Sequence, residues 1–493
     1  MKLSTTSVYA LPIALVLCLY VLNRLQNPLS SYSLSTHHHD SVMKKTESVS
    51  LAPVHQNQTS LSPPLPFIHS DEITASIYKY REMTSSLKPK AFRSWQQRFG
   101  NNTPLPCIID HRVQSWSPFN DYIQRQPTME GFLFVKIEKA ASSTLAGIAA
   151  RISVKVGQRL HKANPNFTRW YDDSSHQWHT AQPICRTRMS HLWSTRGPQV
   201  FLPGKRPQQK SFLWTFFKEP SRRVLSEFFY FFVDLAKPEK RKPTDDATVI
   251  DYLMMHGRGS QIHKILPQRS KVPQWTGAGG DPQKTIAAWA RNDTTTKMNV
   301  SAVVESPEYQ TYRTKVTKYV QSAVNQMDFV GIVERMDESL VLLQWILGLE
   351  GGPGDVMAIN AKSAGSYLYK REPKQLLGTC VVIPKHALSP NVKAFIESDE
   401  WKYVWNLADY MMYEAIQKSL NHTMETAMGR ESFRSALETF HAAQQLVETQ
   451  CSPPHITLSC SPNGTAAWPS QKDPCYYGDA GCGYKCLDRI FGS

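Results

Sequence analysis

Two catalytic patterns are missing from this sequence of 493 residues, and acidic residues are fewer than basic ones. No GxxxxGK[ST] loop is present, which disfavours hydrolysis of nucleoside triphosphates. No convincing Asp-x-Asp pair is present either, because the adjacent Asp172 and Asp173 stand in a predicted loop without a third acidic residue. This second absence argues against the metal-dependent transferases that use nucleotide sugars.

The shortage of acidic residues gives the chain a strong positive charge. Lys and Arg total 56 and Asp and Glu total 41, so the net charge at pH 7 is +15. Such a surplus favours an anionic partner, which by charge alone can be nucleic acid, an anionic glycan, a phosphorylated nucleotide or a membrane surface. Apolar residues make up 41% of the chain, which is enough for a large buried core.

The apolar run near the amino terminus, Val8 to Leu22, has 15 residues and is shorter than the about 20 that span a membrane. No small-residue cleavage pattern follows Leu22, which favours an uncleaved signal anchor over a cleaved signal peptide. Either interpretation puts the rest of the chain in the secretory lumen. We expect a cytosolic tail (1–6), an anchor (7–23), a disordered stem (24–95), a lumenal domain (96–425) and a C-terminal helix with a Cys-rich tail (426–493).

Cysteines and glycosylation signals agree with an oxidising lumen, where nucleic acid is not the expected partner. Apart from Cys18 in the apolar run, eight cysteines allow up to four disulfides, whose pairing the sequence leaves open. Cys475, Cys482 and Cys486 lie within twelve residues, which predicts at least one local disulfide. Seven N-x-S/T sequons occur, at Asn57, Asn101, Asn166, Asn292, Asn299, Asn421 and Asn463.

Short apolar runs alternate with helical patterns in the middle of the chain. The first run, Gly131–Ile137, precedes apolar positions that recur every three or four residues over Thr144–Val156. The second run is Ser211–Phe217, after which Pro220 fits the first turn of a helix that continues to Leu235.

A third run, Asp328–Val333, precedes a helix that is expected to begin with Asp337 as its N-cap and to end near Gly348. Strands that alternate with helices predict an α/β domain with a central parallel sheet. Ligands of such sheets bind outside the carboxyl ends of the strands. The turns after the first two strands are therefore the places to look for a site.

The turn after the first strand has the composition of an anion site. The backbone amides of Ser142, Ser143 and Thr144 at the helix start can bind an anion with the help of the helix dipole, and Lys139 adds a full positive charge. The alternative is an ordinary junction between a strand and a helix.

The turn after the second strand is similar in kind. Lys218 stands at the strand end, and Arg223 and Ser226 are three residues apart on one helix face, so these polar groups can converge on a phosphate. The alternative is a solvated helix start with basic residues on its surface.

Together the two segments resemble the cofactor-binding segments of the membrane-bound carbohydrate sulfotransferases, particularly the galactose 3-O-sulfotransferases and the uronyl and heparan 2-O-sulfotransferases. In that family the first segment, K-T-x-K-x-A-S-[ST]-[ST], holds the 5′-phosphosulfate of 3′-phosphoadenosine-5′-phosphosulfate (PAPS). The residues that match it are Lys136, Lys139, Ala141, Ser142, Ser143 and Thr144.

The second family segment, R-[DE]-P-x-x-R-x-x-S followed by aromatic residues, holds the 3′-phosphate. The matching residues are Glu219, Pro220, Arg223, Ser226 and the aromatic run Phe228–Phe232. Lys218 departs from the pattern, because the family has Arg at this position. A third similarity covers Asp328–Leu347, so the resemblance extends over about Gly131–Leu349.

The resemblance implies a P-loop-like α/β sulfotransferase fold in a type II Golgi membrane protein that transfers a sulfuryl group from PAPS to a hydroxyl of a carbohydrate. The acceptor can be a glycolipid, a glycoprotein or a polysaccharide, including an anionic one, and no metal is expected. Lys139 would stabilise the charge on the transferred group. The family often uses a His between the two segments as base; His161, His176, His179 and His191 are the candidates, and His191 is favoured.

Two other classes of function stay open at this point. One is a lumenal glycosyltransferase, and the other is a secreted or surface glycan-binding glycoprotein whose Cys-rich tail is an interaction module. The basic stretches Gly204–Lys210 and Lys237–Pro243 could bind an anionic glycan, although solvated loops are the favoured explanation.

Overall fold

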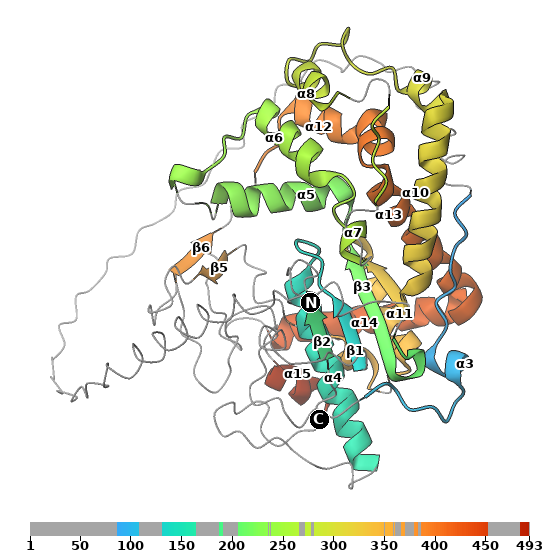
Figure 1. The fold of residues 1–493 in the computed structure, drawn as a ribbon. Helices are drawn as coiled ribbons and strands as arrows, with labels where there is room; N and C mark the ends of the chain where they lie inside the picture. The colour runs from blue at the N-terminus through green and yellow to red at the C-terminus, as the bar shows by residue number, and fades with distance from the viewer. Residues whose placement is uncertain are drawn as a thin grey trace, which may run out of the picture. The chain divides into compact units, whose positions relative to one another are not determined.

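A four-stranded parallel sheet lies at the centre of the described chain (Figure 1). The computed structural model describes residues 86–107, 131–163, 187–190, 206–234, 236, 238–265, 272–277, 281–349, 351–357, 359, 366–369, 379–382, 386–451 and 484–492. All of them belong to one folding unit, residues 68–493.

The sheet has the strand order β2-β1-β3-β4. Its strands are β1 (Gly131–Val135), β2 (Thr187–Ser190), β3 (Ser211–Phe217) and β4 (Phe329–Ile332). Every residue of β1, β3 and β4 is buried, as expected for strands of a parallel sheet covered by helices. The predicted α/β architecture with a parallel sheet is therefore confirmed, and β2 is a strand that the apolar pattern did not reveal.

A helix follows each of the three predicted strands. These helices are α4 (Ser142–Ala163), α5 (Pro220–Phe228) and α11 (Met336–Leu347). Pro220 occupies the first turn of α5, as predicted, and the helix continues as the π-helix η5 (Phe229–Asp234). Asp337 was wrongly expected to be an N-cap: the 3₁₀ turn η9 (Val333–Arg335) follows β4, so α11 begins at Met336 and Asp337 lies inside its first turn.

Further helices surround these units, and a separate antiparallel hairpin stands apart from the main sheet. The hairpin consists of β5 (Ser366–Tyr369) and β6 (Thr379–Val382). The other elements are α3 (Trp95–Phe99), η4 (Gln208–Lys210), η6 (Pro238–Lys240), α6 (Asp246–Tyr252), η7 (Leu253–Gly257), α7 (Ile262–Ile265), α8 (Pro282–Ala290), α9 (Val300–Glu305), α10 (Pro307–Gln326), η10 (Gly352–Asp355), α12 (Pro390–Glu397), η11 (Glu400–Trp405), α13 (Leu407–His422), η12 (Thr423–Met428), α14 (Arg430–Gln450) and α15 (Tyr484–Phe491).

Two apolar clusters hold the unit together. The larger one joins the sheet to helices α4, α10, α11 and α13, and it includes Leu87, Phe92 and Trp95 from the beginning of the described chain. Packed structure therefore extends to residues before 96. The smaller cluster joins α5 to α6, α8 and α12, so α5 is anchored on the side away from the sheet as well.

The C-terminal helices pack on the same unit. α14 contacts α11, and its Phe440 is buried in the larger cluster. A disulfide joins Cys451 to Cys486, 35 residues apart, and holds α15 near the end of α14. Cys486 is thus not paired with either nearby cysteine, and a local disulfide between Cys475 and Cys482, which lie outside the described residues, stays a prediction.

The expected cytosolic tail and anchor, residues 1–23, also lie outside the described residues, as does the stem up to residue 85. Within the described part of the chain, no helix combines the length and the apolar character that crossing a membrane requires.

Candidate functional site

The turn between β1 and α4 has an unusual backbone. Lys139 and Ala141 adopt positive φ angles of 63° and 51°, and among the described residues Asn292 is the only other non-glycine residue that does so. A left-handed conformation costs an L-residue about 1–2 kcal/mol. Turns that contain such residues before a helix N-terminus can present backbone N–H groups to an anion. Strained backbone conformations of this kind are frequent at functional sites.

The first turn of α4 faces partly outward. Ser142, Ser143 and Thr144 are half-buried, and the first N–H groups of any α-helix have no acceptor within the helix. Lys136, just after β1, is buried with 3% of its surface exposed. The Lys139 ammonium lies 3.2 Å from the centroid of the Tyr230 ring, so it is held over an aromatic face at the end of α5.

The second segment lies on the neighbouring strand. β1 and β3 pair in parallel with Val135 opposite Thr215, and the Thr215 hydroxyl donates to the Val135 carbonyl at 2.7 Å. The carboxyl ends of the two strands therefore lie at the same edge of the sheet. This brings the Lys139 turn and the start of α5 together, although they are about 80 residues apart in the sequence.

Lys218, at the end of β3, is fixed through its backbone. Its N–H donates to the side-chain oxygen of Gln261 at 3.1 Å, and the Gln261 amide donates back to the Lys218 carbonyl at 2.8 Å. Burial lowers the pKa of the Lys218 ammonium, an effect that the nearby Glu334 carboxylate opposes. An anion placed at this group would favour its charged form.

Glu219 has a structural role. Its carboxylate caps α5 by accepting from the backbone N–H groups of Ser221 and Arg222 at 3.2 and 2.7 Å. The Tyr410 hydroxyl also donates to it at 2.6 Å. These contacts fix the direction in which α5 leaves the sheet edge.

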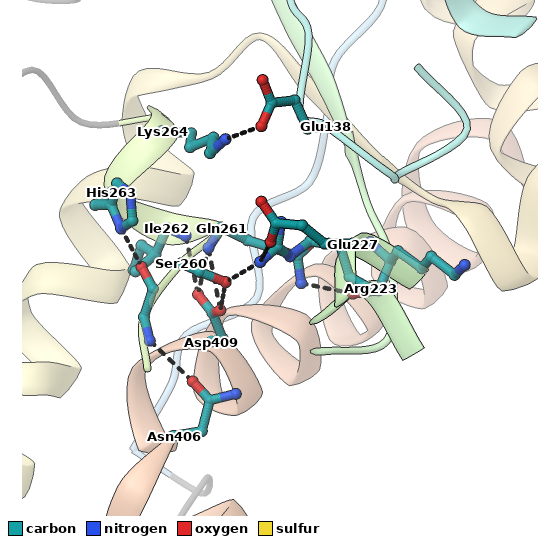
Figure 2. A network of polar contacts seen from close by, with 12 residues as sticks. Glu138, Arg223, Glu227, Ser260, Gln261, Ile262, His263, Lys264, Asn406 and Asp409 are labelled. Carbon is teal, nitrogen blue, oxygen red and sulfur yellow. Dashed lines mark hydrogen bonds and ion pairs between the residues drawn. The ribbon is translucent and has the colours of Figure 1, made fainter. Parts of the chain in front are cut away.

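Arg223 is the most deeply enclosed basic residue of the second segment (Figure 2). Its side chain is 1% exposed, and Nη2 contacts Glu227 at 2.8 Å and donates to Ser260 Oγ at 2.6 Å. Its Nε and Nη1 are buried and have no hydrogen-bond partner among the described residues. An unsatisfied buried donor costs about 1–3 kcal/mol, so an anion that accepts from these N–H groups would relieve a penalty already present in the fold.

Asp409 of α13 organises the segment that faces Arg223. It accepts from the backbone N–H groups of Gln261 and Ile262, the latter at 2.9 Å (Figure 2). Burial raises the pKa of Asp409 to about 6, although these N–H groups and Arg223 favour the carboxylate. The carboxylate thus holds the chain just before α7 in place.

The segment 259–265 touches both predicted cofactor segments. Lys264 forms an ion pair with Glu138 of the first turn at 2.9 Å, and Gln261 holds the Lys218 backbone of the second. Burial lowers the pKa of Lys264, and Glu138 opposes this effect. Sequence reasoning did not identify Gln261, Lys264 or Asp409, because no local pattern shows that these residues lie at the sheet edge.

The remaining predicted residues have different outcomes. Ser226 is half-buried on α5, and Arg222 beside Arg223 is exposed. His191 lies outside the described residues; β2 ends at Ser190, directly before it in the sequence. His176 and His179 also lie outside the described residues, and His161 falls within α4.

Each of the two basic stretches has a residue in contact with a neighbouring side chain. In the first stretch Arg206 is buried and pairs with Asp328 at 2.9 Å, which is a structural role. In the second, Lys242 lies 5.5 Å from the Phe232 ring centroid. Across the described ranges, no three His, Cys, Asp or Glu side chains are grouped so as to hold a metal ion.

Comparison with known proteins adds no relative: no family model, no curated protein and no solved structure matches the chain. Function is therefore inferred from the residues and their geometry.

Proposed function

We propose that the protein is a PAPS-dependent sulfotransferase that transfers a sulfuryl group to a hydroxyl of a carbohydrate acceptor. The observation that carries this proposal is the pairing of β1 with β3, which brings the Lys139 turn and the Arg223 helix start to one edge of a parallel sheet. Those are the two segments whose residues resemble the sulfotransferase cofactor segments.

The local chemistry suits a nucleotide with two separate phosphate groups. The Lys139 turn and the α4 N-terminus offer backbone N–H groups, hydroxyls and a lysine, which match a 5′-phosphosulfate. The start of α5 offers Lys218, Ser226 and the Nε and Nη1 donors of Arg223, which are unpaired among the described residues. These groups match a 3′-phosphate. We extend the proposal to the P-loop-like sulfotransferase fold.

In this mechanism the protein supplies position and charge. An acceptor oxygen attacks the sulfur in line while the bond from sulfur to the 5′-phosphate oxygen breaks, and Lys139 stabilises the charge on the transferred group and the leaving phosphate. A base must take the acceptor proton, and His191 stays the prediction from the sequence. We further propose that the protein is a type II Golgi membrane protein with its catalytic domain in the lumen.

Titration of the detergent-solubilised full chain with 3′-phosphoadenosine-5′-phosphate (PAP) tests the proposal. PAP should bind much more tightly than 5′-AMP, which lacks the 3′-phosphate. Transfer of labelled sulfate from PAPS to a panel of desulfated glycans then identifies the acceptor. A chain that binds neither nucleotide and transfers no sulfate is not a sulfotransferase, and a glycosyltransferase or a glycan-binding glycoprotein would then be the interpretation to test.

A further inference from the structure

A histidine and a carboxylate far apart in the sequence form a close pair beside the aromatic run. His386 Nε2 lies 2.9 Å from Asp234 Oδ1, and the side chains are 21% and 6% exposed. Because the carboxylate accepts, Nε2 carries the hydrogen and Nδ1 keeps its lone pair. The His386 ring also stacks on Phe229, with centroids 4.2 Å apart and an angle of 8° between the planes. The imidazole is thus fixed in orientation by two contacts while it remains partly accessible.

This pair is linked to the Lys139 turn through η5. Phe229, which stacks on His386, and Tyr230, whose ring lies under the Lys139 ammonium, are consecutive residues. Their Cα atoms are about 3.8 Å apart. His386 and Lys139 therefore contact consecutive residues of η5, whose side chains leave the helix in different directions.

We propose that His386 is the base that takes the proton of the acceptor hydroxyl and that Asp234 positions it; this inference rests on the proposed function. As the acceptor oxygen forms its bond to sulfur, its proton moves to His386 Nδ1, and the bond from sulfur to the 5′-phosphate oxygen breaks. The products are the sulfate ester, PAP and protonated His386, which returns the proton to solvent. Asp234 stabilises the imidazolium, as a carboxylate does behind a catalytic histidine.

Asp234 has the properties that such a positioning residue needs. Within the part of the chain that the structure describes, its second oxygen, Oδ2, is buried without a hydrogen-bond partner, and Oδ1 bonds to His386. The carboxylate is thus almost fully buried while the His386 side chain keeps 21% of its surface exposed. A second pair, between His441 Nε2 of α14 and Asp337 Oδ2 of α11 at 3.3 Å, provides a matched comparison, because both of its side chains are more exposed.

The experiment compares His386→Ala, Asp234→Asn, His191→Ala and the control His441→Ala in the full-length protein. PAP affinity, melting temperature and kcat for sulfate transfer are measured, with the glycan that accepts most sulfate from wild type as acceptor. We expect His386→Ala to lower kcat by about 10²- to 10⁴-fold with PAP affinity unchanged, and added imidazole to restore part of the rate. Asp234→Asn should lower kcat without imidazole rescue, and His441→Ala should behave like wild type.

Several results would overturn the assignment. If the kcat of His386→Ala is within threefold of wild type, His386 is not the base. If only His191→Ala loses kcat, and imidazole restores it, His191 is the base. If His386→Ala is misfolded, His386→Gln decides, because its amide can still donate to Asp234 but cannot act as a base: normal turnover overturns the proposal and lost turnover upholds it. If the wild-type protein neither binds PAP nor transfers sulfate, the proposed function itself is refuted. If wild type and His386→Ala are both active, only the assignment of His386 is refuted.

Discussion

Replacement of Arg223 by lysine tests the proposed 3′-phosphate site most sharply. The substitution keeps a positive charge near Glu227 and Ser260 but removes the planar guanidinium that carries the open Nε–H and Nη1–H groups. One charge-assisted hydrogen bond contributes about 1.5–3 kcal/mol. We therefore expect PAP to bind about 10- to 150-fold more weakly to Arg223→Lys than to wild type.

The neighbouring residue supplies the control. Arg222 is exposed, and its side chain needs no rearrangement when it is replaced, so Arg222→Lys should leave PAP affinity within about threefold. Isothermal titration of wild type and Arg223→Lys with PAP and with 5′-AMP gives a double-perturbation cycle. One change removes the guanidinium and the other removes the 3′-phosphate. If Arg223 binds the 3′-phosphate, Arg223→Lys weakens PAP but hardly changes 5′-AMP.

Arg223 is covered by neighbouring side chains, so a phosphate reaches its open N–H groups only if that cover moves. The penalty of about 1–3 kcal/mol for each unsatisfied donor favours such an opening when an anion is available. Equal losses of PAP and 5′-AMP affinity, or no loss of either, would refute this reasoning. Arg223 would then be only a structural partner of Glu227 and Ser260.

Three further predictions concern the support of the site and the tail. Lys218→Ala should weaken PAP binding by about 1.5–3 kcal/mol and Lys218→Arg should preserve it, as measured by titration; equal affinity in wild type and Lys218→Ala would remove Lys218 from the site. Burial raises the pKa of Asp409 to about 6 from 3.8, so its contribution to stability is complete below about pH 4 and is lost as the pH rises through 6. Urea unfolding should accordingly show wild type losing stability relative to Asp409→Asn between pH 4 and 7, and a constant difference would contradict this. Cys451→Ser opens the 35-residue disulfide loop to Cys486 and should cost up to about 4 kcal/mol in the free energy of unfolding; an unchanged urea midpoint would show that the disulfide does not limit stability.

Much of the central fold could be predicted because local patterns specify it. Five of the seven residues in the run Ser211–Phe217 are apolar, and the structure has a strand with the same bounds. Pro220 marks the first turn of α5 because its fixed φ suits that position. β2, with the sequence Thr-Arg-Met-Ser, has no apolar run, and only its pairing with β1 makes it a strand. Tertiary pairing thus decided what local propensity left open.

The candidate site was predictable only where its residues lie in the turns themselves. Lys139 and Ser142 follow β1 directly, so their position at the sheet edge follows from the topology of parallel sheets. His386 and Asp234 are 152 residues apart, and no spacing rule connects them. A search confined to histidines between the two segments could not find His386, because it reaches the aromatic run from the chain before α12.

The segment 259–265 explains how two distant turns can act as one site. A short helix such as α7 has little stability of its own, so its position depends on tertiary contacts. Asp409 fixes the start of the segment from α13, Gln261 holds the end of β3, and Lys264 reaches back to Glu138 after β1. A change at Asp409 should therefore alter both predicted cofactor segments together, because the same few backbone N–H groups set the positions of Gln261 and Lys264.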